Sequence, residues 1–375
     1  MVEWKKLGEI TRRNKGIPIT AGQMSELASA DGNVRVFAAG STIADIDESK
    51  LPNNCAYNLP SIIVKSRGYI DFEFYEKPFT HKNEMWSYSF ENKQEGKYIF
   101  YYLTTKTDFF RKKAKANSVK LPQLCVADTD NYLIPILSIE EQNRIVGILD
   151  TFTSAIDNLK EQIAQRRKQY EHYRDQLLDL EGKENHIVPF GDICEMMKGD
   201  GVQKADFVDE GIGCIHYGQI YTHYGSFTYT TNKYVSQEVF NKAKKASKGD
   251  LVMTDTSENV EDICKTVAYL GEDDIAVSNH ALIIKHKQNP KFLSYSTLTR
   301  SFFVQKRKYV VGVKVSGIKP DDLAKIKIFL PSIEEQNRIV TILDTFETSI
   351  QNLEAQLEQR EKQYEYYRNK LLTFE

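Results

Sequence analysis

The chain has 375 residues, of which 41% are hydrophobic and 27% are charged, and its 50 lysines and arginines nearly balance its 52 aspartates and glutamates. This composition is typical of a folded protein of two or three domains and excludes a fibrous or disordered chain. Its five cysteines lack a CxxC pair, its first residues lack an apolar signal-peptide core, and no run approaches the roughly 20 apolar residues of a membrane span. We therefore expect a soluble, cytoplasmic protein that does not enter a membrane.

The first predicted domain comprises residues 1–137, with a net charge of +3. Residues 34–40 and 61–75 predict strands, because they are rich in Val, Ile, Tyr and Phe and are bounded by Gly or Asn. Residues 98–110 predict a helix, and the basic run 111–120 follows it. Residues 131–138 predict a final strand. The domain is therefore expected to be mixed α/β, and its basic run is either a solvated face or a contact surface for a polyanion.

Residues 138–183 predict one long helix with a net charge of −2. The segment opens with Ser-Ile-Glu-Glu, a capping box in which Ser138 caps the helix and the side chain of Glu141 reaches back. Apolar residues recur at alternating spacings of three and four over five heptads, which is typical of a coiled-coil seam. The predicted seam residues of this helix are Ile145, Leu149, Phe152, Ile156, Leu159, Ile163, Tyr170, Tyr173 and Leu177.

The second predicted domain comprises residues 184–331, with a net charge of +1. Strands are predicted at residues 213–221, 249–255 and 276–285, and a helix is predicted at 292–303. A second basic run, 305–314, follows that helix at the place where the first domain has its own. Residues 325–332 predict a final strand. The two domains are therefore expected to be divergent copies of one mixed α/β unit.

Residues 332–375 repeat the long helix, with a net charge of −4. Residues 332–372 match residues 138–178 without a gap at an offset of 194, with 28 of 41 positions identical, and Ser332 and Glu335 repeat the capping box. A long amphipathic helix cannot bury its seam alone, so we expect the two helices to pair antiparallel with a pseudo-two-fold axis. A helix hairpin that serves only as a support is the alternative. The predicted seam residues of this copy are Ile339, Leu343, Phe346, Ile350, Leu353, Leu357, Tyr364, Tyr367 and Leu371.

Motifs for catalysis are missing from the sequence. It contains no GxxxxGK[ST] phosphate loop, no HExxH, no GxSxG and no [Asn/Asp]-Pro-Pro-aromatic loop of an adenine methyltransferase. The histidines, including His216, His223, His280 and His286, have no acidic partner at metal-ligand spacing. We therefore expect a protein that is not an enzyme and that holds no metal of its own.

The order of domain, long helix, domain and near-identical long helix resembles the specificity subunit of a type I restriction-modification system. The most specific residues are the two segments that enter the helices, Pro135-Ile-Leu-Ser-Ile-Glu-Glu-Gln142 and Ile328-Phe-Leu-Pro-Ser-Ile-Glu-Glu-Gln336. The first segment departs from the family's usual Leu-Pro, because Leu137 stands where the second has Pro331. The segments 36–40, 62–68 and 249–252 also resemble the family, so the resemblance covers the whole chain.

The resemblance implies two target recognition domains, each contacting one half of a bipartite site in double-stranded DNA. The helices would set the distance between the halves and dock two methyltransferase subunits, and motor-nuclease subunits would complete the complex. S-adenosylmethionine, ATP and magnesium would bind those partner subunits and not this chain. Rival possibilities are a scaffold without a DNA role and a free-standing methyltransferase or nuclease. The residues that we predict to contact DNA are Lys65, Arg67, Lys113, Lys115, Lys120, Lys204, Tyr217, Gln219, Arg307 and Lys314.

Overall fold

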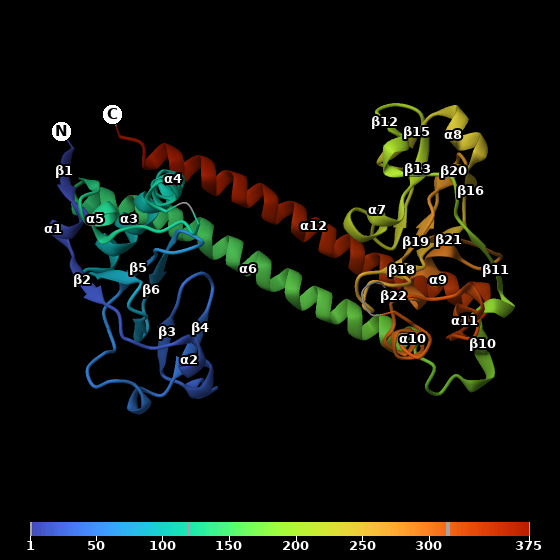
Figure 1. The fold of residues 1–375 in the computed structure, drawn as a ribbon, viewed down its shortest axis with the longest axis horizontal. Coiled ribbons are helices and arrows are strands. Elements are labelled where there is room, and N and C mark those ends of the chain that lie inside the picture. The colour runs from blue at the N-terminus through green and yellow to red at the C-terminus, as the bar shows by residue number, and fades with distance from the viewer. Residues whose placement is uncertain (1, 119, 313–315, 375) are drawn as a thin grey trace. The chain divides into compact units, whose positions relative to one another are not determined.

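The computed structural model describes residues 2–118, 120–312 and 316–374. The chain forms two compact units. Unit 1 comprises residues 1–160 and 355–375, and unit 2 comprises residues 161–354. Each unit therefore contains one mixed α/β part together with a portion of each long helix (Figure 1).

Unit 1 is built on two β-sheets. The larger is antiparallel with the order β2-β8-β5-β6, and the smaller has the order β4-β3-β7 with β3 parallel to β7. A separate antiparallel pair joins β1 to β9. The strands are β1 Glu3–Lys6, β2 Arg12–Lys15, β3 Val34–Phe37, β4 Ile43–Ile46, β5 Ser61–Lys65, β6 Asp71–Tyr75, β7 Phe79–His81, β8 Trp86–Ser89 and β9 Leu133–Ile136. The helices are α1 Leu7–Ile10, α2 Ala21–Leu27, α3 Lys93–Thr104, α4 Thr107–Asn117 and α5 Val126–Asp130.

Unit 2 has the same plan, but each of its two sheets has five strands. Its first sheet has the order β11-β21-β17-β19-β14 and its second the order β12-β15-β13-β20-β16, with β13 parallel to β20. Short antiparallel pairs join β10 to β23 and β18 to β22. The strands of the first sheet are β11 Cys194–Lys198, β21 Ala281–His286, β17 Leu251–Thr254, β19 Thr266–Tyr269 and β14 Phe227–Thr228. Those of the second are β12 Phe207–Val208, β15 Lys233–Val235, β13 Ile212–Ile215, β20 Ile275–Val277 and β16 Lys244–Ala246. The remaining elements are β10 Ile187–Pro189, β18 Thr256–Ser257, β22 Ser316–Gly317, β23 Lys327–Phe329, α7 Tyr217–Thr222, α8 Gln237–Lys242, α9 Pro290–Ser296, α10 Arg300–Lys306 and α11 Pro320–Leu323.

The two units share a strand order despite their divergent sequences. In the larger sheets, β2-β8-β5-β6 of unit 1 corresponds to β11-β21-β17-β19 of unit 2. In both units the strand at the edge of this sheet, β2 or β11, pairs antiparallel with the strand that directly precedes the helices, β8 or β21. The predicted mixed α/β fold with an internal repeat is therefore confirmed, and elements can be compared between the units by their place in the sheet.

Several predicted elements are divided in the structure. The helices predicted at 98–110 and 292–303 are each two helices, α3 with α4 and α9 with α10. In unit 2 the break is made by Thr299, whose hydroxyl accepts a hydrogen bond from the backbone N–H of Phe302 (3.2 Å) and so starts a new helix. The long apolar periodicity could not reveal a local cap that restarts the chain in a new direction.

Three predicted strands are also divided. Residues 61–75 form the antiparallel pair β5–β6, and the turn between them contains Gly68 at φ +77°. Residues 276–285 form β20 and β21, with His280 between them at φ +64°. Residues 213–221 were wrongly predicted as one strand, because β13 ends at Ile215 and α7 begins at Tyr217. The helix starts there because a side-chain cap at His216 outweighs the alternating apolar pattern.

The long helices are α6, Ile139–Leu178, and α12, Ile333–Leu371. Ser138 and Ser332 cap them as predicted, each accepting from the backbone N–H three residues later (3.3 and 3.4 Å). The expected return of the glutamate side chain to the cap is wrong. Instead, Glu141 accepts two hydrogen bonds from Arg144 (2.8 and 2.6 Å), and Glu335 does the same with Arg338. A bidentate contact between two charges is stronger than one bond to a neutral N–H.

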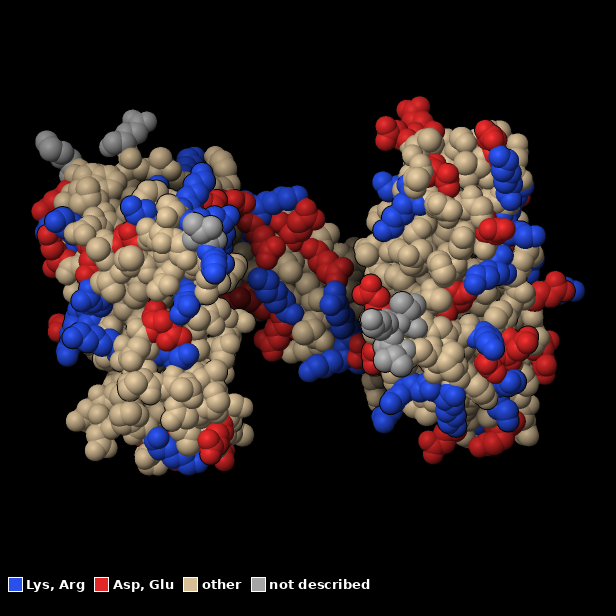
Figure 2. Space-filling view, viewed as in Figure 1, with Lys and Arg blue, Asp and Glu red and all other residues tan. Residues whose placement is uncertain are grey.

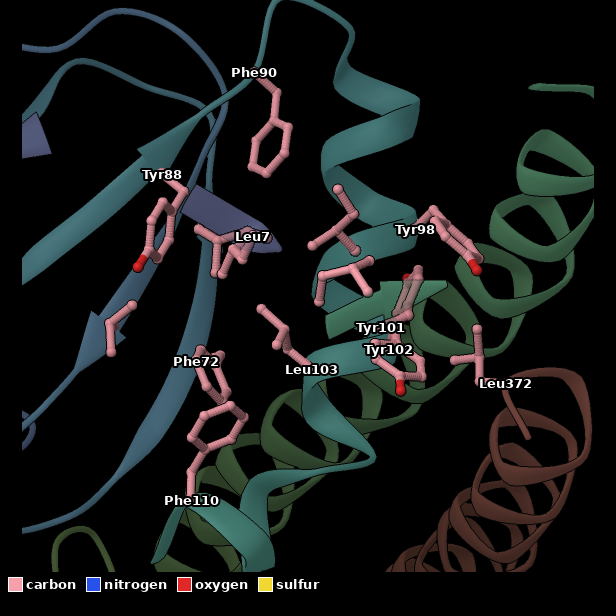
Figure 3. Packing of buried hydrophobic residues seen from close by; sticks show 14 of the residues in the cluster. Leu7, Phe72, Tyr88, Phe90, Tyr98, Tyr101, Tyr102, Leu103, Phe110 and Leu372 are labelled. Carbon is pink, nitrogen blue, oxygen red and sulfur yellow. The ribbon is translucent and has the colours of Figure 1, made fainter. Parts of the chain in front are cut away.

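The core of unit 1 joins its larger sheet to both long helices. Figure 3 shows Leu103 of α3 and Phe110 of α4 gathered near Phe72 of β6, while Tyr98 points toward α6. Leu372, just after the end of α12, belongs to the same buried cluster. The helix ends are therefore part of the folded core of this unit rather than a separate stalk. None of the helices in the described part of the chain is long and apolar enough to cross a membrane.

Candidate nucleic-acid interface and helix pair

In unit 1 the beginning of α6 packs on the end of α12. The rings of Phe152 and Tyr367 stack with centroids 5.3 Å apart, and the guanidinium of Arg360 lies over the ring of Phe152 at 5.8 Å. Lys160 and Glu361 form an ion pair of 3.2 Å. Because the residue numbers rise along one helix as they fall along the other, the two helices are antiparallel here.

Unit 2 contains contacts at the equivalent positions with the helices exchanged, and the charges of its ion pair are reversed. The rings of Tyr173 and Phe346 stack at 5.4 Å, and Arg166 lies over Phe346 at 5.9 Å. Arg167 and Glu354 form an ion pair of 2.5 Å. Each contact is obtained from its unit 1 counterpart by the offset of 194, with α6 and α12 exchanging roles. This is the contact pattern that a pseudo-two-fold repeat requires.

The predicted seam residues differ in burial. Ile145, Leu149 and Ile156 of α6 are at most 7% exposed, as are Ile163 of α6 and Ile339 and Leu343 of α12. Tyr173 and Tyr367 are 44% and 41% exposed. The other predicted seam residues are half-buried: Phe152, Leu159, Tyr170, Leu177, Phe346, Ile350, Leu353, Leu357, Tyr364 and Leu371. The predicted seam is therefore most buried at the beginnings of both helices and at Ile156 and Ile163 of α6, whereas the tyrosines of the two stacked aromatic pairs are exposed.

A second pair of equivalent contacts ties each α/β part to a long helix. In unit 1, Asp150 of α6 accepts from the hydroxyl of Tyr101 (2.6 Å) and from Lys97 (2.7 Å), both on α3. Burial, followed by the hydrogen bond to this carboxylate, raises the pKa of Tyr101. The hydroxyl therefore stays protonated and acts as a donor.

In unit 2, Asp344 of α12 accepts in the same way from Tyr295 (2.7 Å) and from Lys291 (2.8 Å), both on α9. The three residue types and their offset of 194 are the same in both units. This Lys–Tyr–Asp cluster is called the clamp of each unit.

The loop that follows the central strand occupies an equivalent place in each larger sheet. We call residues 66–70, between β5 and β6, the tip loop of unit 1, and residues 255–265, between β17 and β19, the tip loop of unit 2. Ser66 at the start of the first loop accepts from the N–H of Leu124 (2.8 Å), and Asp255 at the start of the second accepts from that of Ile318 (3.0 Å). Leu124 and Ile318 are again 194 residues apart, so each tip loop pairs with the segment that follows the basic run.

The predicted contact residues of unit 1 differ from one another in their exposure. Lys65 is held by an ion pair with Glu73 (2.7 Å), and its side chain is only 19% exposed. Arg67 is exposed on the tip loop. Lys113 and Lys115 are exposed on α4, where Figure 2 shows a gathering of basic side chains, and Lys120 is exposed beyond it. Lys113 lies 3.9 Å from Asp128. One exposed basic residue, Arg67, therefore lies on the tip loop, and the three exposed lysines lie on α4 or just after it, whereas Lys65 is paired with Glu73.

Unit 2 gives a mixed result for its predicted contact residues. Lys204 and Arg307 are exposed, and Tyr217 is half-buried with its ring against His280. Gln219 is buried: its amide donates to Asn232 (2.6 Å) and accepts from the N–H of His216 (3.0 Å). Those bonds leave its amide committed inside the fold and unsuited to a DNA base. Lys314 lies outside the described residues.

Two cations beside the tip loops were not among the predicted contact residues. Arg111 of α4 donates to the carbonyl oxygen of Ile70 (3.2 Å), and Lys306 of α10 donates to those of Glu261 (2.9 Å) and Ile263 (2.6 Å). Both lie in the basic runs, but their contacts are made with loops distant in sequence. For Lys306 the sequence did contain an indication, because it stands four residues after the buried Phe302 and so shares its helix face.

The polar groups inside the units serve structure. His81 is buried beside Ser87 (3.1 Å), and burial lowers its pKa to about 4, so it stays neutral. Burial raises the pKa of Cys214 and of Cys264 to about 12, which leaves both thiols unreactive. Among the residues that the structure describes, no three His, Cys, Asp or Glu side chains come together as metal ligands would.

A family model described as the type I restriction modification DNA specificity domain matches residues 1–166 and 183–361. The chain is 28% identical over 393 residues to the specificity subunit of the type I restriction enzymes EcoR124I and EcoR124II of Escherichia coli, spanning all of this chain and 94% of that protein. It is 22% identical over 297 residues to the MjaVIII specificity subunit of Methanocaldococcus jannaschii, covering 74% of this chain and 69% of that protein.

The fold also matches solved structures. A crystal structure of the S subunit of a type I restriction-modification system from M. genitalium superposes with a TM-score of 0.61 at 14% identity, covering 100% of this chain and 97% of that one. A second structure, from work on complex assembly and conformational transition of the type I R-M system, gives a TM-score of 0.53 at 17% identity, with 99% and 96% covered. At these identities the likeness concerns the fold.

Proposed function

This chain belongs to the type I restriction modification DNA specificity family, and from that premise we propose that it recognises a bipartite DNA sequence, one half with each unit. Each unit would present its tip loop and the neighbouring basic residues to one half-site. Bases are distinguished by hydrogen bonds and apolar contacts at their edges, whereas phosphates attract any cation. The tip loops would then supply sequence recognition, and residues such as Lys113, Lys115 and Arg307 would supply general affinity.

One observation carries this proposal. The units keep the same strand order and the same pairing of tip loop and following segment, while their sequences diverge. The long helices, in contrast, are identical at 28 of 41 positions. Two α/β parts with one fold and different surfaces are suited to recognise two different DNA sequences. Two nearly identical helices are suited to bind two copies of the same partner.

The contacts between α6 and α12 support the binding of two copies of the same partner. Tyr173 with Phe346, and Tyr367 with Phe152, form two equivalent stacked pairs whose tyrosines are 44% and 41% exposed. Exposed aromatic side chains flanked by arginine are typical of the centre of protein interfaces. We propose that these surfaces dock two methyltransferase subunits and that motor-nuclease subunits join the assembled complex.

The chemistry of modification and cleavage would come from those partners. The sequence has no phosphate loop and no methyltransferase loop, which supports a chain that is itself not catalytic. S-adenosylmethionine would bind the methyltransferase subunits, and ATP and magnesium would bind the partner subunits that use them. The contribution of this chain is then the choice of the DNA sequence.

Sequencing of methylated bases in host DNA tests this function. Three cell lines are compared: one with the gene, one without it, and one in which residues 184–331 are exchanged for the matching part of a relative. We expect a two-part motif that disappears with the gene and changes in only one half with the exchange. A motif that persists without the gene would favour a scaffold that has no DNA role. A hybrid that changed both halves would refute independent reading by the two units.

A further inference from the structure

We propose that Lys306 in unit 2 and Arg111 in unit 1 are positioning residues for base recognition, because each holds the tip loop of its own unit through the loop backbone. This inference rests on the proposed function and goes further, since it assigns sequence specificity to two cations that need not touch DNA.

Lys306 is a buried ammonium group with only 4% of the residue exposed. Its Nζ donates to the carbonyl oxygens of Glu261 and Ile263 on the tip loop. Burial lowers the pKa of Lys306, which is the expected consequence of removing its charge from water. Burying a cation is costly unless its donors are satisfied. The loop carbonyls supply that satisfaction, so the shape of the loop and the place of the ammonium depend on each other.

The anchored arm of the loop determines what the exposed arm presents. Ile263 and Cys264 are buried, and Cys264 has φ +63°, a left-handed conformation that residues other than glycine rarely adopt. Glu258 and Asn259 in the middle of the loop are exposed. A strained backbone of this kind persists when its surroundings hold it in place. We infer that Lys306 supplies part of that hold.

A second anchor secures the opposite side of the same loop. The hydroxyl of Tyr221 on α7 donates to the carbonyl oxygen of Thr256. Asn259 also hydrogen-bonds through its side chain to Asp262 (2.7 Å), which closes the exposed arm on itself. The loop is therefore fixed from two neighbouring helices, and removal of either anchor should loosen the same exposed side chains.

Unit 1 solves the same problem with a different residue. Arg111 donates through Nε to the carbonyl oxygen of Ile70 and through a terminal nitrogen to the hydroxyl of Tyr69 (3.1 Å). Its guanidinium also lies over the ring of Tyr69, 5.1 Å from the centroid. Tyr69 is 59% exposed. Arg111 therefore orients an exposed aromatic side chain at the tip of the loop.

Loss of such a hold should affect specificity more than general affinity. Discrimination between bases depends on the direction of each hydrogen bond, whereas attraction to phosphates depends mainly on charge. A loosened tip loop would accept wrong bases in its own half-site. The other half-site would keep its preference, because its tip loop is held by its own cation.

The experiment measures methylation by the assembled complex of this chain with its methyltransferase subunits, on DNA with each half-site randomised. Lys306→Met is compared with Lys308→Met, which removes an exposed cation two residues away, and Arg111→Met is compared with Lys112→Met on the same helix. We expect Lys306→Met to lower the preference for the correct base about tenfold at one or more positions of one half-site. Arg111→Met should do so in the other half-site, and both control variants should keep the wild-type preference.

Tyr221→Phe serves as a second variant for the unit 2 loop, because it removes one hydroxyl and leaves the buried cation in place. Thermal unfolding of each complex identifies variants that fail to fold. If Lys306→Met is one of them, the base preference of Tyr221→Phe tests the proposal for unit 2. An unchanged base preference in the folded variants would overturn the proposal, as would an equal loss on all sequences or a change in both half-sites. If the wild-type complex itself showed no sequence preference, the proposed function would fail first.

Discussion

The hydroxyl of Tyr295 on α9 donates a 2.7 Å hydrogen bond to the carboxylate of Asp344 on α12. The same contact joins Tyr101 to Asp150 in unit 1, at 2.6 Å and at an offset of 194 in both residues. A neighbouring lysine completes each clamp. Because the two α/β parts have diverged, the survival of one polar contact at the same place in both units indicates a shared requirement. The clamp fixes how an α/β part is seated on its long helix.

Removal of the carboxylate should therefore weaken the unit that contains it. Asp344→Ala leaves a tyrosine hydroxyl and a lysine without their acceptor and is expected to cost about 1–3 kcal/mol of stability in unit 2. Asp150→Ala should have the same effect on unit 1. Amide hydrogen exchange measures this separately for each unit. Loss of protection in both units with a single variant would contradict the assignment, and Asp157→Ala, an exposed carboxylate on α6, is the control.

Glu347 should make the stability of unit 2 depend on pH. It accepts from Ser226 (3.0 Å) and Tyr170 (3.3 Å), and burial, the largest cause, raises its pKa above that of an exposed glutamate. The folded unit therefore holds a proton that the unfolded chain releases, so the destabilising effect appears as the pH rises through the unfolded pKa and is complete above the folded pKa.

Glu347→Gln should consequently stabilise the unit more at pH 8 than at pH 5. Chemical denaturation at the two pH values measures the difference. The equivalent position in the other repeat is Thr153, which has no such charge. Amide hydrogen exchange of unit 1 at the two pH values is therefore the internal reference. A stabilisation that is equal at the two pH values, or larger at pH 5, would contradict a raised pKa of Glu347 in the folded unit.

The exposed lysines of α4 are expected to contribute affinity without specificity. Lys113→Glu combined with Lys115→Glu should weaken DNA binding by the assembled complex. The slope of log Kd against log salt concentration should fall by about two or more, because fewer phosphate contacts release fewer counterions. The methylated sequence should stay the same. Lys5→Glu combined with Lys6→Glu, on β1 of the same unit, makes the same change of charge and is the matched control. An unchanged salt dependence would mean that α4 carries only a solvated basic face.

The long helices should act as a ruler between the half-sites. One heptad inserted after Leu159 and another after Arg360 would preserve the seam, because each block brings its own apolar positions. The helices lengthen by about 10 Å at 1.5 Å per residue. At roughly 3.4 Å per base pair, the unread spacer should then grow by about three base pairs.

Affinity should fall for the lengthened variant, because three extra base pairs rotate the second half-site by roughly 100°. DNA twisting or bending must absorb most of that rotation. Sequencing of the methylated motif gives the new spacer. Retained methylation with the old spacer would show that the helices do not set the distance, and altered bases in either half would show that the α/β parts are not the readers.

Much of this architecture was determined by local features of the sequence. The offset of 194 revealed the repeat, the 3-4 spacing predicted both long helices, and Ser138 and Ser332 begin them as a capping pattern requires. The strands β17, β9 and β23 lie where alternation of apolar residues predicts them. These features depend on neighbours within a few residues, whose interactions are the same in almost any fold, so they can be recognised without the tertiary structure.

Only the tertiary structure decided which polar side chains are available. Lys65 and Gln219 carry suitable groups, yet Lys65 forms an ion pair with the partly exposed Glu73, and Gln219 is buried and donates to Asn232. Lys306 belongs to a run of basic residues but points inward to carbonyl oxygens more than forty residues away in sequence. Helical or strand periodicity indicates the face on which a side chain lies, but not what approaches that face. Because a buried charge is stable only with a partner in place, the long-range packing determines whether a cation is free for DNA or is part of the scaffold.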